Sequence, residues 1–273
     1  MKKVARGTIV ILRYATLLTV CILSSCFQER GNIEAVQAAA SKALQVNSFR
    51  FEMLQEVVLP NVALPVLYEM KGEYAYPDKV ITEITTHVGP DVKAHFVILR
   101  FGRGYFVKLP AETRAFYPGV KDWVAGSVDE IKASRFLKLL PEEVQDISQT
   151  ISLIEAAGDE VSLRDYTALE KKGVNYVAHY VFALDAERLA RGHAHGKFGL
   201  FASGGGEIWV GVDDLLRQMH VVLLGPTKAG GAGRVDAKVN IRDHGAELSF
   251  RAPRQEDVTS FAALKNRFPD SFA

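Results

Sequence analysis

Two long stretches of this chain alternate apolar and polar residues with a period of two. Between residues 49 and 109 the alternating segments are separated by short turns that contain Pro or Gly, and a second set occupies 164–184 and 207–251. Successive side chains of a strand point to opposite faces of its sheet, so this period predicts strands with one buried and one wet face. Short turns join antiparallel neighbours, because a parallel pair needs a long crossover. The pattern therefore predicts an antiparallel sheet.

The second stretch is expected to form three hairpins, whose turns lie at 171–173, 213–214 and 244–245. The last turn would be followed by a strand over 247–251. Two further segments, 190–206 and 225–233, are rich in glycine and are expected to be loops.

Two regions instead repeat apolar residues at helical spacing. The first predicts a helix over 32–45, and the second predicts two helices within 127–157. Ser127 and Glu130 open the second region with the spacing of a capping box, in which each side chain bonds the other residue's backbone N–H. The chain has no repeat and no low-complexity linker, so a single domain over 32–273 is predicted.

The N-terminus has the layout of a secretory signal. An apolar run over 15–23 follows four basic residues, Lys2, Lys3, Arg6 and Arg13. The run is shorter than the roughly 20 apolar residues that span a bilayer. It ends in Leu-Ser-Ser-Cys at 23–26, which resembles the bacterial lipobox, where the cysteine receives fatty acyl chains such as palmitate and becomes the new N-terminus. The alternative is an ordinary signal peptide followed by a chance cysteine.

These features predict a lipoprotein signal peptide at 1–25, an acylated tether at 26–31 and a domain from residue 32. Cys26 would then attach the protein to the extracytoplasmic face of a membrane in a bacterial cell envelope. Loss of the four basic residues of 1–25, a segment without acidic residues, changes the formal charge from +1 to −3. A nearly neutral chain without a basic cluster argues against a nucleic-acid partner.

The segment 207–224 carries the most specific resemblance to a known family. A tryptophan-bearing strand, an acidic turn and a Leu-Arg strand succeed one another there, as in the recurrent strand-turn-strand of the LppX/LprG and LolA/LolB group of envelope lipid carriers. The segments 176–184 and 235–250, with Ala252-Pro253, are similar to the flanking strands of that group. The resemblance covers nearly all of 32–262, and the glycine-rich segments 190–206 and 225–233 depart from it.

The resemblance implies an α+β fold, a single-domain half-barrel made of a curved, unclosed antiparallel sheet with helices covering its concave face. It also implies a lipid or glycolipid ligand in an apolar cavity, attachment to the membrane through the N-terminal lipid, and a transporter or another envelope protein as partner. The helices of 127–157 would cover the cavity.

Candidate residues for such a cavity are the apolar side chains expected on the inner sheet face and on the covering helices. They are Phe51, Met53, Tyr68, Met70, Tyr74, Ile84, Phe96, Ile98, Phe136, Leu140, Ile147, Ile151, Tyr180 and Phe182. Aromatic rings and adaptable methionines suit acyl chains. Alternation alone does not distinguish side chains that line a cavity from side chains that fill a core, so both interpretations remain open.

No motif predicts catalysis, so we expect neither an enzyme nor a cofactor or metal. His193 and His195 have no Cys or carboxylate at zinc-like spacing. Ser203 precedes three glycines, but Phe201 breaks the Gly-x-Ser-x-Gly pattern of a nucleophile elbow. The acidic pair 213–214 suits a hairpin turn, where Asp side chains bond the nearby backbone.

A second functional class is an envelope sensor or structural lipoprotein that acts through a protein partner. Proteins related to RseB combine a similar curved sheet with a role in envelope-stress signalling, and they carry an added C-terminal domain. Only 20 residues follow Pro253 in this sequence, which favours the lipid carrier as the expectation.

Overall fold

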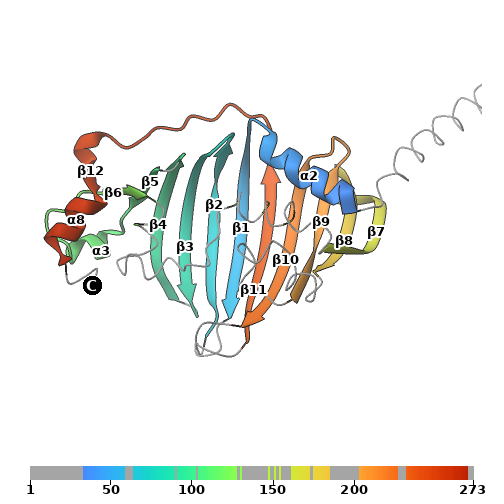
Figure 1. The fold of residues 1–273 in the computed structure, drawn as a ribbon, viewed down its shortest axis with the longest axis horizontal. Helices are drawn as coiled ribbons and strands as arrows, with labels where there is room; N and C mark the ends of the chain where they lie inside the picture. Colours follow the sequence, from blue (N-terminus) through green and yellow to red (C-terminus); the bar gives the residue numbers. More distant parts are fainter. Residues whose placement is uncertain are drawn as a thin grey trace, which may run out of the picture.

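A computed structural model describes residues 33–58, 64–89, 91–102, 104–127, 161–172, 175–184, 203–226 and 232–269, and single residues 130, 147, 151 and 154. Its main feature is one 12-stranded sheet (Figure 1). The strands are β1 (Ser48–Val58), β2 (Val66–Ala75), β3 (Lys79–Val88), β4 (Asp91–Phe101), β5 (Gly104–Lys108), β6 (Trp123–Ser127), β7 (Val161–Lys172), β8 (Asn175–Leu184), β9 (Ser203–Gly211), β10 (Leu216–Pro226), β11 (Ala232–Arg242) and β12 (Val258–Ser260).

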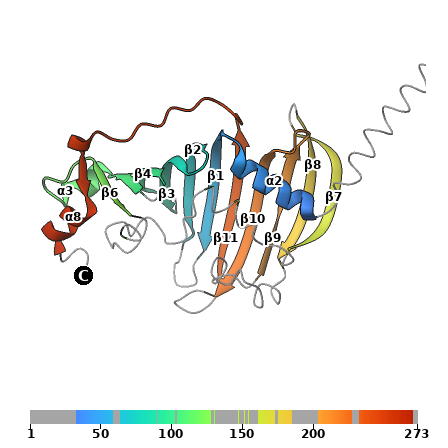
Figure 2. The same ribbon diagram turned by 45° about the horizontal axis from the view of Figure 1, so that its top comes forward.

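The sheet consists of two antiparallel meanders that meet in its middle. The strand order is β12-β6-β5-β4-β3-β2-β1-β11-β10-β9-β8-β7, and every pair is antiparallel except β12 with β6. Strand β1 pairs with β11 from Arg50↔Arg242 to Val58↔Arg234, which joins the N-terminal meander to the C-terminal one. The sheet is curved and its edges remain apart (Figure 2). The predicted α+β half-barrel is therefore confirmed.

The two faces of the sheet differ as the alternation predicts. In β1 the side chains of Phe49, Phe51 and Met53 are buried, whereas Glu52 and Leu54 between and beyond them are exposed. We call the face with the buried side chains the inner face and the opposite one the outer face. Cross-strand partners continue both faces over the neighbouring strands, because residues opposite each other in a ladder point to the same side.

Two glycines of the inner face allow close approach of neighbouring groups. A Cβ at Gly72 would lie 2.1 Å from the carbonyl oxygen of Ile81 and 2.8 Å from the Cζ atom of Phe51, its cross-strand partner. A Cβ at Gly206 would lie 2.2 Å from the carbonyl oxygen of His220 and 3.1 Å from Cζ of Phe182. At each position an aromatic ring occupies the space that a side chain would fill.

Gly206 also shows that one prediction was wrong. Residues 203–206 were expected to belong to a glycine-rich loop, but they form the first half of β9 and pair with β8 and β10. In the same way Gly225 and Gly233 extend the β10–β11 ladder instead of lying in a loop. Glycine weakens a strand but does not prevent one where a neighbouring ring covers it.

Helix α2 (Ile33–Gln45) confirms the first predicted helix. Its buried residues are Val36, Ala39, Ala40 and Ala43, which lie on one side of the helix and belong to the main hydrophobic core. The helix crosses the sheet near the ends of β11, β10, β9 and β8 (Figure 1) and contacts β7, β9 and β10. Three alanines allow it to approach closely. The Lys42 ammonium donates to the carbonyl oxygen of Asp213 at 2.6 Å.

The far edge of the sheet is completed by the C-terminal segment. A short 3₁₀ turn, η3 (Gln255–Asp257), leads into β12, and helix α8 (Phe261–Arg267) follows it, beside β6 and the short helix α3 (Ala111–Ala115) (Figure 1). The Ser260 hydroxyl caps α8 by accepting from the N–H of Ala263 at 3.2 Å, and Phe261 and Leu264 are buried.

The strand predicted over 247–251 does not form. The chain turns at Asp243 and Gly245, which both have positive φ, and then runs past the ends of β1–β4 to the far edge (Figures 1 and 2). Ser48 fixes the position of the exit point, the turn at 243–246 where the chain leaves β11. Its carbonyl oxygen accepts from the N–H of Gly245 at 2.8 Å, and its hydroxyl donates to the carbonyl oxygen of Ala246. These bonds direct the chain across the strand ends, away from the β11 ladder.

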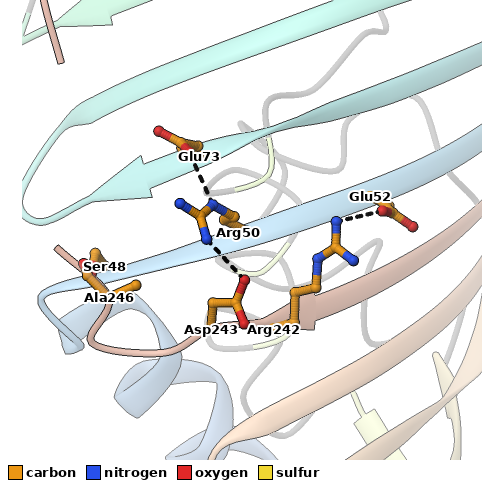
Figure 3. A network of polar contacts seen from close by, with 7 residues as sticks. All are labelled: Ser48, Arg50, Glu52, Glu73, Arg242, Asp243 and Ala246. Atoms are coloured by element: carbon orange, nitrogen blue, oxygen red, sulfur yellow. Dashed lines mark hydrogen bonds and ion pairs between the residues drawn. The ribbon is translucent and has the colours of Figure 1, made fainter. Parts of the chain in front are cut away.

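An ion-pair network surrounds this exit point on the outer face (Figure 3). Arg50 lies between Glu73 of β2 and Asp243, at 3.0 and 3.1 Å, and Arg242 pairs with Glu52 at 2.8 Å. The hydrogen bonds that Arg50 donates to Glu73 and Asp243 raise the pKa of Arg50. Exposed ion pairs of this kind add little to stability because solvent screens them, so the network supports the register of β11, β1 and β2 more than the stability of the fold.

The predicted capping box is confirmed. The Ser127 N–H donates to Glu130 Oε2 at 2.8 Å, and the Glu130 N–H donates to the Ser127 hydroxyl at 3.2 Å. The bonds from Ser127 lower the pKa of Glu130, because they stabilise its ionised form. Glu130, Ile147, Ile151 and Ile154 are helical, and the rest of 128–160 lies outside the described residues.

His244, in the turn after β11, predicts a loss of stability in mild acid. Its Nδ1 lies 2.8 Å from Nη1 of Arg217, and since a guanidinium only donates, the ring accepts and is neutral. Burial, and then the charge of Arg217, lower the pKa of His244. The unfolded chain therefore takes up the proton first as the pH falls. Stability contributed by His244 should be complete above about pH 6.5 and decline below it.

Urea unfolding at pH 8 and pH 5.5 would measure this effect in the wild type and in His244→Gln. The variant should lose less free energy of unfolding between the two pH values, although the other histidines titrate in both proteins. Equal losses would show that the His244–Arg217 contact does not couple to folding.

Candidate functional site

A continuous row of apolar side chains crosses the inner face at right angles to the strands. Its members are direct cross-strand partners in β8, β9, β10, β11, β1, β2, β3 and β4, namely Tyr180, Ile208, Met219, Val239, Met53, Met70, Ile84 and Phe96. We call this set the apolar row. Each member is at most 4% exposed. At about 4.8 Å per strand, the row is roughly 34 Å long along the curve of the sheet.

The row next to it is divided into an apolar and a polar half. In β8 to β11 it consists of Phe182, Gly206, Val221 and Ala237. In β1 to β3 it continues as Gln55, Tyr68 and Thr86, which are 2%, 4% and 1% exposed. We call these last three residues the polar row. Beyond it the partners Val57 and Val66 are again apolar.

An aromatic cluster lies at the opposite end of β1 and β2. The rings of Phe49 and Tyr74 stack with centroids 4.7 Å apart, and Phe51 meets Phe49 edge-on at 6.4 Å. The hydroxyl of Tyr74 lies 3.1 Å from the carbonyl oxygen of Leu44 and 3.2 Å from that of Pro77. The hydrogen bond from Tyr74 to Leu44 connects the C-terminal end of α2 to strand β2.

Two helical segments contribute to the same core as the inner face. One is α2, and the other carries Ile147, Ile151 and Ile154, which are buried in the main hydrophobic cluster. Their spacing of four and three residues places the three isoleucines on one side of a helix. The inner face is thus covered where it is described.

The structure brings most of the predicted cavity residues together. Phe51, Met53, Tyr68, Met70, Tyr74, Ile84, Phe96, Tyr180 and Phe182 are buried on the inner face, Ile98 is partly buried beside them, and Ile147 and Ile151 belong to the same cluster. Phe136, Leu140 and Cys26 lie outside the described residues. Burial alone is also what a filled core would show, so the assignment of these residues to a ligand stays a prediction.

Some polar members of the inner face, Gln55 and Thr86 among them, were not included in the candidate residues predicted from the sequence. Alternation marks Gln55 and Thr86 as inward positions, but the apolar expectation for such positions hid their polarity. Arg100 and Tyr105, cross-strand partners at the far end of β4 and β5, are also on the inner face. The signal that could have found them is a polar residue at an inward position of an otherwise alternating strand.

The outer face carries charged and polar contacts between strands. His179 stacks on Trp209 with ring centroids 4.6 Å apart, and its two nitrogens lie 3.2 Å from Glu170 and 3.1 Å from Glu207. His220 contacts Asp236 at 2.9 Å. Within the described part of the chain, no group of three or more His, Cys, Asp or Glu residues is arranged to hold a metal ion. His193 and His195 lie outside it.

The acidic turn 213–214 has the structural role predicted for it. An Asp213 carboxylate oxygen accepts from the N–H of Leu215 at 3.3 Å, and the other pairs with Arg217. Asp214 adopts φ of 64° and lies 3.8 Å from the Lys42 ammonium.

None of the helices in the described ranges is long and apolar enough to cross a membrane.

Several solved structures match the chain at low identity. LprF from Mycobacterium bovis has a TM-score of 0.46 and 10% identity, and the match covers 81% of this chain and 96% of LprF. The Mycobacterium tuberculosis lipoprotein LppX has a TM-score of 0.43 and 14% identity, with 80% and 96% covered. A Vibrio parahaemolyticus domain described as an outer membrane lipoprotein-sorting protein has a TM-score of 0.29 and 10% identity, with 78% and 90% covered.

These likenesses include LppX, a member of the group that the sequence resembles. No family model and no curated protein matches the chain. All three TM-scores are below 0.5, so nothing about ligands or partners is transferred from these proteins to this chain.

Proposed function

We propose that this protein is an envelope lipoprotein that binds an acyl-chain lipid or glycolipid between the inner face of its sheet and the helical segment carrying Ile147, Ile151 and Ile154. The observation that carries the proposal is the apolar row, which is continuous over eight strands and has no charged member. A single chain of methylenes can follow the row from Ile208 in β9 to Phe96 in β4 without meeting a polar side chain.

Burial of the chain supplies the affinity. Each buried methylene contributes about 0.8 kcal/mol, so ten of them contribute roughly 8 kcal/mol, on the order of micromolar affinity before the losses of association are subtracted. Because the apolar row is buried, a ligand reaches it only when the isoleucine-bearing segment moves away from the sheet. Met53, Met70 and Met219 can then repack around the chain, since methionine adapts to irregular contacts.

The proposed lipid on Cys26 puts the domain where its ligand is abundant. Helix α2 begins at Ile33, which is seven positions after Cys26. An extended chain of that length reaches at most about 25 Å. The domain would therefore remain within a short distance of the membrane surface, on the extracytoplasmic side.

Mass spectrometry of organic extracts tests the proposal. Protein purified from membranes after expression with its own signal should release a non-covalent lipid in a fixed ratio to protein. Met70→Gln should lower that ratio severalfold, because it places an amide in the middle of the apolar row and burial of an amide is unfavourable. Leu54→Gln is the matched control, since Leu54 is exposed on the outer face of the adjacent strand.

Two outcomes decide against the proposal. Lipid-free wild-type protein that also fails to bind a fluorescent fatty acid would identify a solid core. Equal lipid recovery from Met70→Gln and Leu54→Gln would place the lipid outside the inner face. A stoichiometric protein partner recovered without lipid would favour the sensor or structural class instead.

A further inference from the structure

We propose that the polar row binds a neutral carbonyl group of the ligand, as found in an ester, and that Thr86 is its hydrogen-bond donor. This inference rests on the function proposed above and names the polar group that accompanies the acyl chain.

The first argument is the state of the Thr86 hydroxyl. Thr86 is 1% exposed, and its Oγ1 atom has no hydrogen-bond partner among the described residues. A buried hydroxyl without a partner destabilises a fold, and valine would fill the same space without that loss. A ligand atom that accepts a hydrogen bond from the Thr86 hydroxyl would explain why a threonine, and not a valine, occupies this position.

The second argument is where the hydroxyl lies. Thr86 and its partner Tyr68 are two residues along their strands from Ile84 and Met70, so the polar row runs directly beside the apolar row on the same face. Val57 and Val66 close the other side. A group that leaves an acyl chain lying on Met70 and Ile84 meets Thr86 next.

The third argument is that the polar row and the described strand residues next to it on the inner face carry no charge. The members of the polar row are an amide, a phenol and a hydroxyl, and the neighbouring row contains only valines at β1 and β2. A buried carboxylate or phosphate would need a compensating charge, because burial of an isolated ion is strongly unfavourable. An ester carbonyl needs only a donor. The site thus favours an esterified chain over a free fatty acid.

Competition binding tests the inference. The predicted mature chain, 26–273 with Cys26→Ser, would be loaded with a dansyl-labelled fatty acid, which is then displaced by methyl laurate, by laurate at pH 8 or by dodecane. Wild type should bind methyl laurate about three- to tenfold more tightly than dodecane, the range expected for one hydrogen bond. Thr86→Val should reduce that ratio to about one while folding at least as stably as wild type.

Thr82→Val is the matched control, because Thr82 is a buried threonine on the same face of the same strand, beside Gly72 and not in the polar row. It should keep the wild-type ratio. If Thr86→Val keeps the ratio as well, or if wild type prefers laurate to its ester, the inference is overturned while lipid binding stands. If none of the probes binds wild type, the proposed function itself fails.

Discussion

Replacing Cys26 with serine is expected to abolish labelling of the protein by palmitate in living cells. Only a thiol at the lipobox position receives the lipid, and acylation through two or more chains is what makes membrane attachment stable. The expected change is complete, since the variant either leaves the membrane or stays there as a larger, unprocessed precursor. Labelling with an alkyne palmitate analogue and partition into a detergent phase would measure it.

Cys21 offers a matched control within the same segment. It lies in the apolar run and is removed with the signal peptide if cleavage occurs before Cys26. Cys21→Ser should therefore be labelled and processed as wild type. Palmitate on the Cys26→Ser protein, or its loss from the Cys21→Ser protein, would refute the lipoprotein assignment and leave an ordinary secretory signal.

Gly72→Ala and Gly206→Ala are expected to destabilise the fold by about 3 kcal/mol each, at the upper end of what overpacking usually causes. In both cases the new Cβ would lie 2.1–2.2 Å from a backbone carbonyl oxygen of a neighbouring strand. A backbone atom cannot rotate away, so the strands themselves must separate. Removal of glycine normally stabilises by restricting the unfolded chain, and the opposite sign would therefore come from the close approach.

Gly104→Ala is the control for this experiment. A Cβ at Gly104 would lie 3.5 Å from the carbonyl oxygen of Phe101, an ordinary contact. Its free energy of unfolding should stay within about 1 kcal/mol of wild type. Urea denaturation of the three variants gives the comparison, and similar values for all three would mean that the inner face relaxes easily around an added methyl group.

The regular strands of the N-terminal meander were predictable because one face is buried and the other is wet. Strands β1 to β5 lie within the predicted stretch 49–109, except that β1 begins one residue earlier. Strand β6 and helix α3 were not predicted, since each has five residues and too few positions to reveal a period. The strand expected over 247–251 failed because alternation cannot report that Ser48 turns the chain away from β11.

The candidate site was predictable in outline only. Inward positions such as Met70 and Phe96 follow from alternation, whereas their alignment into one row over eight strands depends on the pairing of β1 with β11, which no local signal contains. The polar row could not be predicted from the sequence for a related reason. Gln55, Tyr68 and Thr86 are far apart in sequence, and only the register makes them neighbours.

The central β1–β11 pairing also governs the order in which the protein can assemble. Strands β1 to β6 are made first, but β1 remains an edge strand until residues 234–242 of β11 have been synthesised. A long, half-apolar edge is a template for pairing with other chains. The N-terminal meander is therefore exposed to aggregation for most of the time that the chain is being made. A product truncated before β11 would leave β1 and β10, the two strands that pair with β11, each without a partner along one edge.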